Sequence, residues 1–244
     1  MMTANPSTDV VNSLMAALER DPRVDLHKFP VHAALEGGSL VLEGMQENIA
    51  AKRAAARAAH RVAGNLAVVD RLRVTAVRFQ EDGALRAEVI STLTQEPVFT
   101  EYGMRVRRNG GWEVVREVAA GQGGHIDIEI GDGVVTLSGE AGSLSHRRLA
   151  EVLVWWTAGC QLVENRLRVV PAEAENDGEL VDAIRMVLEK DPLVHADQVL
   201  VRSRSGVVTL GGYVASEQER KLAVLDVWCV PGVHDVVDEI RARS

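Results

Sequence analysis

Residues 133–153 read GVVTLSGEAGSLSHRRLAEVL, and residues 206–225 read GVVTLGGYVASEQERKLAVL. Each stretch is a short apolar run that ends in a glycine, Gly139 or Gly212. Four residues later stands a serine, Ser143 or Ser216, and apolar residues then follow at helical spacing. Serine is a favoured helix N-cap because its hydroxyl accepts a hydrogen bond from an unpaired backbone N–H group. Both stretches therefore predict the same strand–turn–helix unit.

A third and more divergent copy lies near the start of the chain, where SLVLEG ends at Gly44 and Asn48 takes the capping position. In every copy a second glycine follows the strand glycine at the same interval, 64 − 44 = 159 − 139 = 232 − 212 = 20 residues. An acid–proline pair precedes every copy, at residues 21–22, 96–97 and 191–192. Equal intervals with matching flanks predict three tandem repeats of one module.

Each module is predicted to run helix, strand, strand, helix, strand. An amphipathic helix precedes each acid–proline pair, as in LVDAIRMVLEKD at residues 180–191, and the proline stands where it cannot continue that helix. The first two strands should form a hairpin, and the second helix should return the chain to add a third strand such as VVDEIRA at residues 236–242. The predicted fold class is α+β, with three small mixed three-stranded sheets that each carry two helices on one face.

The predicted modules cover residues 9–76, 82–171 and 177–243, after a disordered polar lead of residues 1–8. The middle module carries an insertion near residues 101–124. Pro97 to Ile126 spans 29 positions, whereas the equivalent Pro192 to Val199 spans seven, a difference of 22.

The insertion includes MRVRRNGGWEVVREV at residues 104–118, which predicts two strands around an Asn-Gly-Gly turn. GQGG at residues 121–124 then predicts a flexible return. The hairpin either projects as a contact for a partner or membrane, or adds an edge strand to the sheet. Its candidate contact residues are Arg105, Arg107, Arg108 and Trp112.

The strand, serine cap, basic helix, glycine and short final strand resemble the pattern of the BON domain of bacterial osmotic-shock and nodulation proteins. The motifs Gly-Val-Val-Thr-Leu-Ser-Gly and Gly-Val-Val-Thr-Leu-Gly-Gly carry this resemblance, which covers nearly the whole chain outside the tails, linkers and insertion. It implies attachment to phospholipid or cell-envelope surfaces, or a stress-related binding role.

Basic pairs recur eight and nine positions after each strand glycine, on the second helix of each module. These basic residues either bind an anionic headgroup or lie on a solvated helix face. On a solvated face their charges would be balanced by local ion pairs such as Glu217 with Lys221. The six residues are Lys52, Arg53, Arg147, Arg148, Arg220 and Lys221. Third-strand residues Asp70, Asn165 and Asp238 are also equivalent, and we expect them to face outward or begin a turn.

The net charge of −8 argues against nucleic-acid binding, which needs a basic surface. No stretch is long and apolar enough for a membrane span, and no secretory signal is visible, so we expect a cytoplasmic protein with peripheral membrane association. Two cysteines without metal-ligand spacing, scattered histidines and the absence of a phosphate-binding loop or nucleophile elbow predict no metal, no cofactor and no enzyme activity.

The predicted function is non-catalytic binding, with anionic phospholipid or an envelope protein as partner. One alternative is a structural scaffold that forms homo-oligomers through sheet edges and the helices bearing Trp155 and Trp228. Another is a small-ion sensor.

Overall fold

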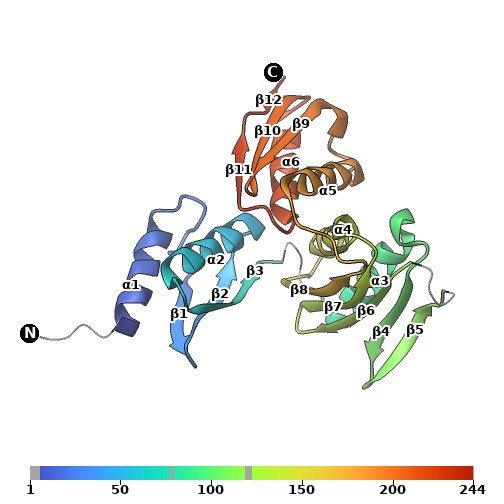
Figure 1. Cartoon of the computed structure of the whole chain (residues 1–244), viewed down its shortest axis with the longest axis horizontal. Helices are drawn as coiled ribbons and strands as arrows, with labels where there is room; N and C mark the ends of the chain where they lie inside the picture. The colour runs from blue at the N-terminus through green and yellow to red at the C-terminus, as the bar shows by residue number, and fades with distance from the viewer. Residues whose placement is uncertain (1–5, 77, 79, 119–122, 244) are drawn as a thin grey trace, which may run out of the picture. The chain divides into compact units, whose positions relative to one another are not determined.

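The computed structural model describes residues 6–76, 78, 80–118 and 123–243. The chain divides into two compact units, Met1–Thr75 and Ala76–Ser244. The first unit holds one module and the second holds two, and each module can be followed in Figure 1 as two helices with their own sheet. The α+β class and the three-module architecture are therefore confirmed.

The first module contains five elements in the predicted order: α1 (Pro6–Glu19), β1 (Val31–Glu36), β2 (Ser39–Gln46), α2 (Ile49–Ala63) and β3 (Ala67–Val74). β1 and β2 are antiparallel, and α2 returns the chain so that β3 runs parallel to β2. Helix α1 begins at Pro6, three residues before the predicted start of the module at residue 9, so residues 6–8 are helical, and residues 1–5 lie outside the described part. The core joins leucines of α1 and the sheet to the alanine-rich face of α2.

The middle module repeats this order and adds the inserted hairpin. Its elements are α3 (Asp82–Gln95), the short 3-10 helix η1 (Pro97–Phe99), β4 (Gly103–Arg108), β5 (Gly111–Arg116), β6 (His125–Gly131), β7 (Val134–Ala141), α4 (Leu144–Trp155) and β8 (Leu162–Val169). The strand order is β5-β4-β6-β7-β8, so the hairpin extends the sheet to five strands. β4 runs parallel to β6, and Met104 and Val106 of β4 are at most 1% exposed. Of the predicted return GQGG, Gly121 and Gln122 lie outside the described residues.

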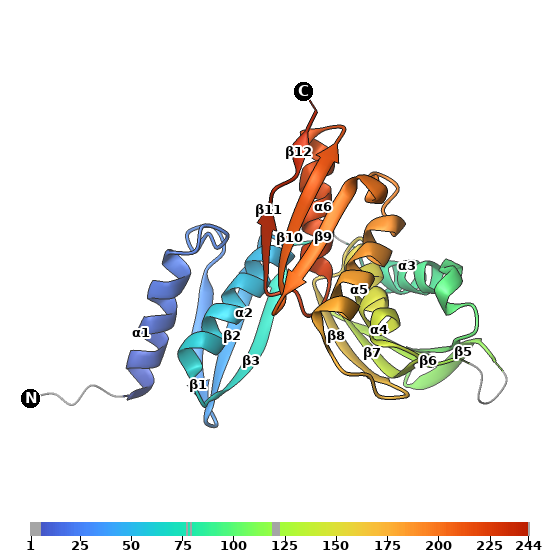
Figure 2. The ribbon, with the colours of Figure 1, turned by 45° about the horizontal axis from the view of Figure 1, so that its top comes forward.

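The third module contains α5 (Asp177–Lys190), the 3-10 helix η2 (Ala196–Gln198), β9 (Val199–Arg204), β10 (Val207–Val214), α6 (Glu217–Cys229), β11 (Asp235–Asp238) and β12 (Arg241–Ala242). The predicted third strand is thus divided into two short strands, β11 and β12, which both run parallel to β10. In the second unit α4 packs against α5 and α6, so the two modules make contact through their helices. Figure 2 shows this contact between α4 and α5.

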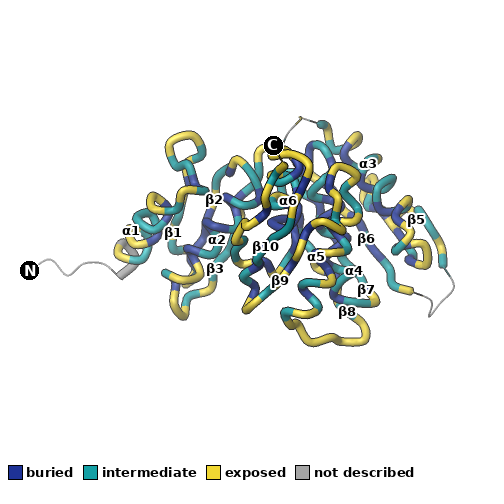
Figure 3. The backbone as a smooth tube through the Cα atoms, turned by 90° about the horizontal axis from the view of Figure 1, so that it is seen from above, coloured by how far each residue is buried: buried dark blue, intermediate teal, exposed yellow. Residues whose placement is uncertain are grey.

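The second helices begin as predicted, because the side chains of Asn48, Ser143 and Ser216 each accept a hydrogen bond from the N–H group three residues later, at 3.0–3.2 Å. Buried stretches follow the strands and the inner helix faces, whereas turns are mainly exposed (Figure 3). In each sheet the face opposite the helices is open to solvent.

The strand glycine of each repeat is required because the backbone of the neighbouring hairpin strand comes very close at this position. Gly44, Gly139 and Gly212 have φ angles of +136°, +116° and +106°. A β-carbon at these positions would lie very close to a backbone carbonyl oxygen at the start of the preceding strand. The distances are 2.5 Å to Pro30, 2.3 Å to His125 and 2.1 Å to Gln198. Both the backbone conformation and the close approach exclude other residues, which explains why the glycine recurs in every module.

Candidate functional site

The first basic residue of each helix-two pair is placed next to the equivalent residue of the third strand. Lys52 Nζ lies 2.5 Å from Asp70 Oδ2, and Arg220 Nε lies 2.8 Å from Asp238 Oδ2. In the middle module the contact uses the backbone, since Asn165 Nδ2 donates to the carbonyl oxygen of Arg147 at 2.9 Å. This position therefore joins helix two to the third strand in every module.

The same third-strand residue also organises its own backbone. Its side-chain Oδ1 accepts a hydrogen bond from the N–H group two residues later in all three modules. The distances are 2.9 Å for Asp70 with Leu72, 3.2 Å for Asn165 with Leu167 and 3.0 Å for Asp238 with Ile240. Asp70 and Asn165 stand within continuous strands, and all three side chains contact helix two. The expectation that these residues face outward or begin a turn is therefore wrong, because each side chain bonds to its own strand and to helix two.

The second basic residue of each pair has a different environment in each module. Arg148 is 4% exposed and forms an ion pair with Glu179 of α5, so it belongs to the contact between the second and third modules. Burial lowers the pKa of Arg148, although the nearby Glu175 carboxylate opposes this shift. Arg53 is half-buried, and Lys221 is exposed on α6. The six helix-two residues are thus largely occupied by structural contacts.

The inserted hairpin gathers aromatic and basic side chains on the open face of the middle sheet. The guanidinium groups of Arg105 and Arg107 lie 5.4 and 5.3 Å from the ring centroid of Trp112. Trp112 is 42% exposed, and Val114 on the same face of β5 is 52% exposed. Cations above an indole ring are attracted by its electron-rich face. We call Arg105, Arg107, Trp112 and Val114 the hairpin patch.

Two of the hairpin arginines also have carboxylate partners. Arg105 donates two hydrogen bonds to the carboxylate of Asp127 on β6. Its Nε lies 2.8 Å from Oδ1, and its Nη2 lies 2.6 Å from Oδ2. Arg108 lies outside the patch and pairs with Glu113 at 3.2 Å. Arg107 pairs with no carboxylate among the described residues. It is therefore the arginine of the hairpin patch best placed to bind an external anion.

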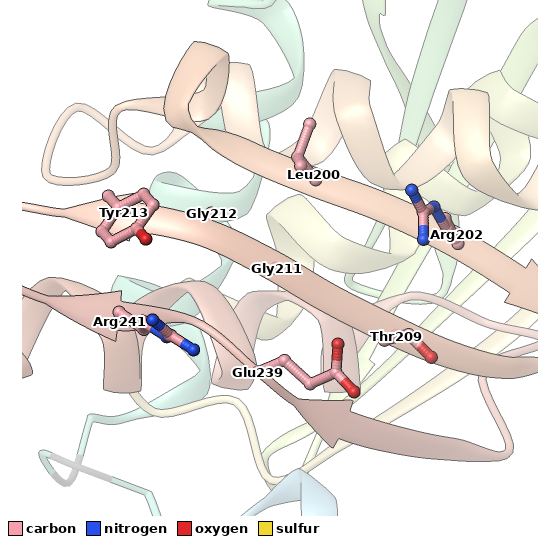
Figure 4. Close-up of a pocket in the computed structure, with 8 residues that line it drawn as sticks. All are labelled: Leu200, Arg202, Thr209, Gly211, Gly212, Tyr213, Glu239 and Arg241. Carbon is pink, nitrogen blue, oxygen red and sulfur yellow. The ribbon is translucent and has the colours of Figure 1, made fainter.

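A second surface, which the sequence analysis missed, lies on the open face of the third module's sheet. A hollow of about 220 Å³ is centred on Gly211, which has no side chain to fill it. Leu200 and Tyr213 border it and are 61% and 53% exposed, and Arg202, Glu239 and Arg241 complete its rim (Figure 4). Shallow hollows of this size are below the usual range for small-molecule pockets.

The described residues contain no group of three or more histidine, cysteine, aspartate or glutamate side chains arranged to hold a metal ion. The ion-sensor alternative therefore has no candidate site in that part of the chain. Cys160 and Cys229 are both buried thiols, and burial raises the pKa of Cys160 to about 12. A thiol with so high a pKa remains protonated and is a poor nucleophile at neutral pH. Trp228, at 4% exposure, is a packing residue.

The sequence matches the BON domain over residues 7–76, 113–171 and 176–244. The chain belongs to the BON domain family. The second match begins within the inserted hairpin, yet α3 packs against α4 and β6 and supplies the first helix of that BON module. The insertion therefore separates α3 in sequence, but not in space, from the rest of its domain.

Two solved structures of CdsD, a structural protein of the type III secretion system of Chlamydia trachomatis, are similar to this chain. The first, its C-terminal domain, has 15% identity and a TM-score of 0.25 and covers 99% of this chain and 100% of that one. The second has 16% identity and a TM-score of 0.26 and covers 96% and 92%. A comparison with curated proteins gives no match. Scores this low support no conclusion about this BON protein.

In the part of the chain that the structure describes, no helix has the length and apolar character needed to cross a membrane.

Proposed function

We propose that this BON protein is a non-catalytic binding protein that attaches to anionic phospholipid surfaces through the hairpin patch. The observation that carries this proposal is the partly exposed ring of Trp112 with two arginines close to it, whose guanidinium groups lie 5.4 and 5.3 Å from the ring centroid. Indole rings favour the headgroup region of a bilayer because they combine a large apolar ring with a polar N–H group. Guanidinium groups bind phosphate through parallel hydrogen bonds. Val114 adds apolar surface beside the ring.

The charge distribution favours the hairpin patch over the helix-two residues as the point of contact. The whole chain has a net charge of −8, so an anionic surface attracts it only where cations are gathered locally. Lys52 and Arg148 are buried in ion pairs and cannot reach a membrane without breaking them. Arg107 is partly exposed and lies next to an aromatic ring. Attachment by so small a patch should be weak and sensitive to salt.

Co-sedimentation with vesicles tests this proposal. We expect the protein to sediment with vesicles that contain phosphatidylglycerol at low salt, and to remain in solution with pure phosphatidylcholine. Arg107→Ala and Trp112→Ala should each abolish most of the binding, because the first removes the arginine of the patch that has no carboxylate partner among the described residues and the second removes its aromatic ring. Lys221→Ala is the matched control, since it removes one exposed positive charge from α6.

Two outcomes would count against the proposal. If phosphatidylglycerol vesicles bind no protein at low salt, attachment to anionic lipid is excluded. If Lys221→Ala weakens binding as much as Arg107→Ala, overall charge rather than the hairpin controls the interaction.

Membership of the BON family is the reason to extend the proposal to a stress-related role at the cell envelope, where an envelope protein would be the alternative partner. A strain that lacks this protein should then survive osmotic shock less well than its parent. The wild-type chain should restore survival, and Trp112→Ala should not.

A further inference from the structure

Strand β1 forms an open edge of the first module's sheet. Among the described residues it pairs with β2 and with no other strand. His32, Ala34 and Glu36 alternate along this strand and are all exposed. An open edge presents unpaired N–H and C=O groups to solvent, and proteins usually cover or charge such an edge.

The other two modules protect the equivalent edge. In the middle module β4 covers β6, the counterpart of β1. In the third module the counterpart is β9, which carries the exposed arginines Arg202 and Arg204. Charged side chains of one sign oppose the pairing of such a strand with its own copy. β1 has neither form of protection.

We infer that two copies of this chain pair antiparallel through β1, with Ala34 of each copy facing Ala34 of the other. In this register His32 of each copy faces Glu36 of the other. The outward side chains of one copy therefore match those of the other. An imidazole lies opposite a carboxylate on each side of the central pair of alanine methyl groups. The contact is isologous and closes after two copies. It goes beyond the proposed attachment to lipid and does not depend on it.

The turn after β1 determines which backbone groups point to the open edge. Gly37 and Gly38 have φ angles of +55° and +83°, as in a type I′ turn between Glu36 and Ser39. In such a turn the carbonyl of the first residue accepts a hydrogen bond from the N–H group of the fourth. The backbone groups of Glu36 therefore face β2.

The N–H and C=O groups of successive residues point to opposite edges of a strand, so those of Ala33 and Leu35 face the open edge. The proposed register places Ala33 of one copy opposite Leu35 of the other. These residues can then exchange N–H to C=O hydrogen bonds. Ala34 becomes a non-hydrogen-bonded pair, in which the two side chains approach most closely.

The surface along this edge offers apolar contacts to an added strand on its helix side. A groove of about 320 Å³ follows β1, with Val11 and Met15 of α1 and Ala33 of β1 in its lining, and the polar side chains of His32, Glu36 and Glu43 also line it. The middle module shows how such a strip is covered, because Val106 of β4 lies beside Ile128, the counterpart of Ala33. A second β1 would bring its Leu35 to the same place, opposite Ala33.

A charge exchange tests the register, with the mass of the full chain measured by sedimentation equilibrium over a range of concentrations without lipid. The wild-type protein should pass from monomer to dimer. His32→Glu and Glu36→His should each weaken the dimer by about tenfold or more, since each puts like groups opposite one another. The double variant His32→Glu/Glu36→His should restore it. A wild-type monomer at every concentration, or single variants that associate as well as the wild type, would overturn the inference.

A cysteine at the symmetry axis gives a second readout. Residues in a non-hydrogen-bonded antiparallel pair have Cα atoms about 4.5 Å apart, which a disulfide can span. Ala34→Cys should therefore form a covalent dimer under mild oxidation, whereas His60→Cys, exposed on α2, should not. The native Cys160 and Cys229 are buried and should not interfere. Equal crosslinking of both variants would show random collision and contradict the register.

Discussion

Arg148 on α4 and Glu179 on α5 form an ion pair that is buried where the second and third BON modules meet. Ser145 adds a hydrogen bond to the same carboxylate at 3.0 Å. The side chain of Arg148 is 5% exposed and that of Glu179 is 17% exposed, so both charges have lost most of their water. Each therefore depends on the other to remain charged in this position.

Arg148→Ala should destabilise the second unit, because it leaves Glu179 buried without its main partner. We expect the free energy of unfolding to fall by about 3–5 kcal/mol. Urea unfolding followed by circular dichroism measures this change. The double variant Arg148→Met/Glu179→Leu should recover most of the loss, since it removes both charges together.

Arg147→Ala is the control for this experiment. Arg147 precedes Arg148 on the same helix but is half-exposed, and its guanidinium lies 4.0 Å from Glu175. Its removal should change the free energy of unfolding by less than about 0.5 kcal/mol. A similar loss in both variants would indicate a general effect on helix α4 and not the buried pair.

The recurring pair between helix two and the third strand predicts a difference between modules. The side chain of Lys52 is 8% exposed beside Asp70, whereas that of Arg220 is 37% exposed beside Asp238. Lys52→Ala should lower the free energy of unfolding by about 2–3 kcal/mol, because Asp70 then loses a partly buried partner. Arg220→Ala should cause little loss, since water replaces an exposed partner easily. Equal effects at both positions, measured by urea unfolding, would contradict this reasoning.

The sequence was sufficient to predict the module and its number of copies, because the strand glycine, the helix cap and the second glycine each perform a local task. Gly212 illustrates this, since its φ angle and its contact with a backbone carbonyl admit no side chain whatever the tertiary context. Such signals can be read one residue at a time. The division of the last strand into β11 and β12 was not predicted, because it has no comparably local signal.

The surface residues were harder to predict, because their roles depend on which module packs against which. Arg148 and Lys221 occupy equivalent positions after the strand glycine, yet one is buried between modules and the other is exposed. The hollow at Gly211 has no signal within β10 alone, because it arises where a residue without a side chain lies opposite Leu200 on the neighbouring strand. Its only sequence signal is the cross-strand pairing of this glycine with an outward-facing leucine of β9.

Adjacent glycines in β10 offer a matched test of this close backbone approach. Gly212→Ala should destabilise the third module by at least about 2 kcal/mol, because the residue has a φ angle of +106° and its β-carbon would lie 2.1 Å from the carbonyl oxygen of Gln198. Gly211→Ala should be tolerated, because its β-carbon would meet only Leu200, at 3.9 Å. Thermal unfolding of the two variants checks the difference. Comparable losses would show that β10 tolerates alanine at neither position, and the close backbone approach at Gly212 would not explain the repeated glycine.

The carboxyl group of Asp226 on α6 should make stability fall as pH rises. Asp226 is 4% exposed, at a position where the other modules have Ala58 and Leu153. Burial, and then the nearby Asp191 carboxylate, raise its pKa from 3.8 to about 8, although a hydrogen bond from Trp156 opposes this. Between about pH 4 and 8 the folded protein therefore holds a proton that the unfolded chain releases.

Unfolding consequently becomes easier with rising pH across this window, by up to about 1.4 kcal/mol per pH unit for one proton, and the dependence should level off above pH 8. Asp226→Asn should remove this contribution, because an amide does not titrate in the range. Asp226→Leu should in addition raise the free energy of unfolding at pH 8, since it replaces a buried polar group with the residue type found at position 153. The measurement is the urea midpoint of each variant at intervals from pH 5 to 9. If the wild-type and Asp226→Asn curves run parallel, Asp226 is ionised in the folded protein, and some other group must explain any slope they share.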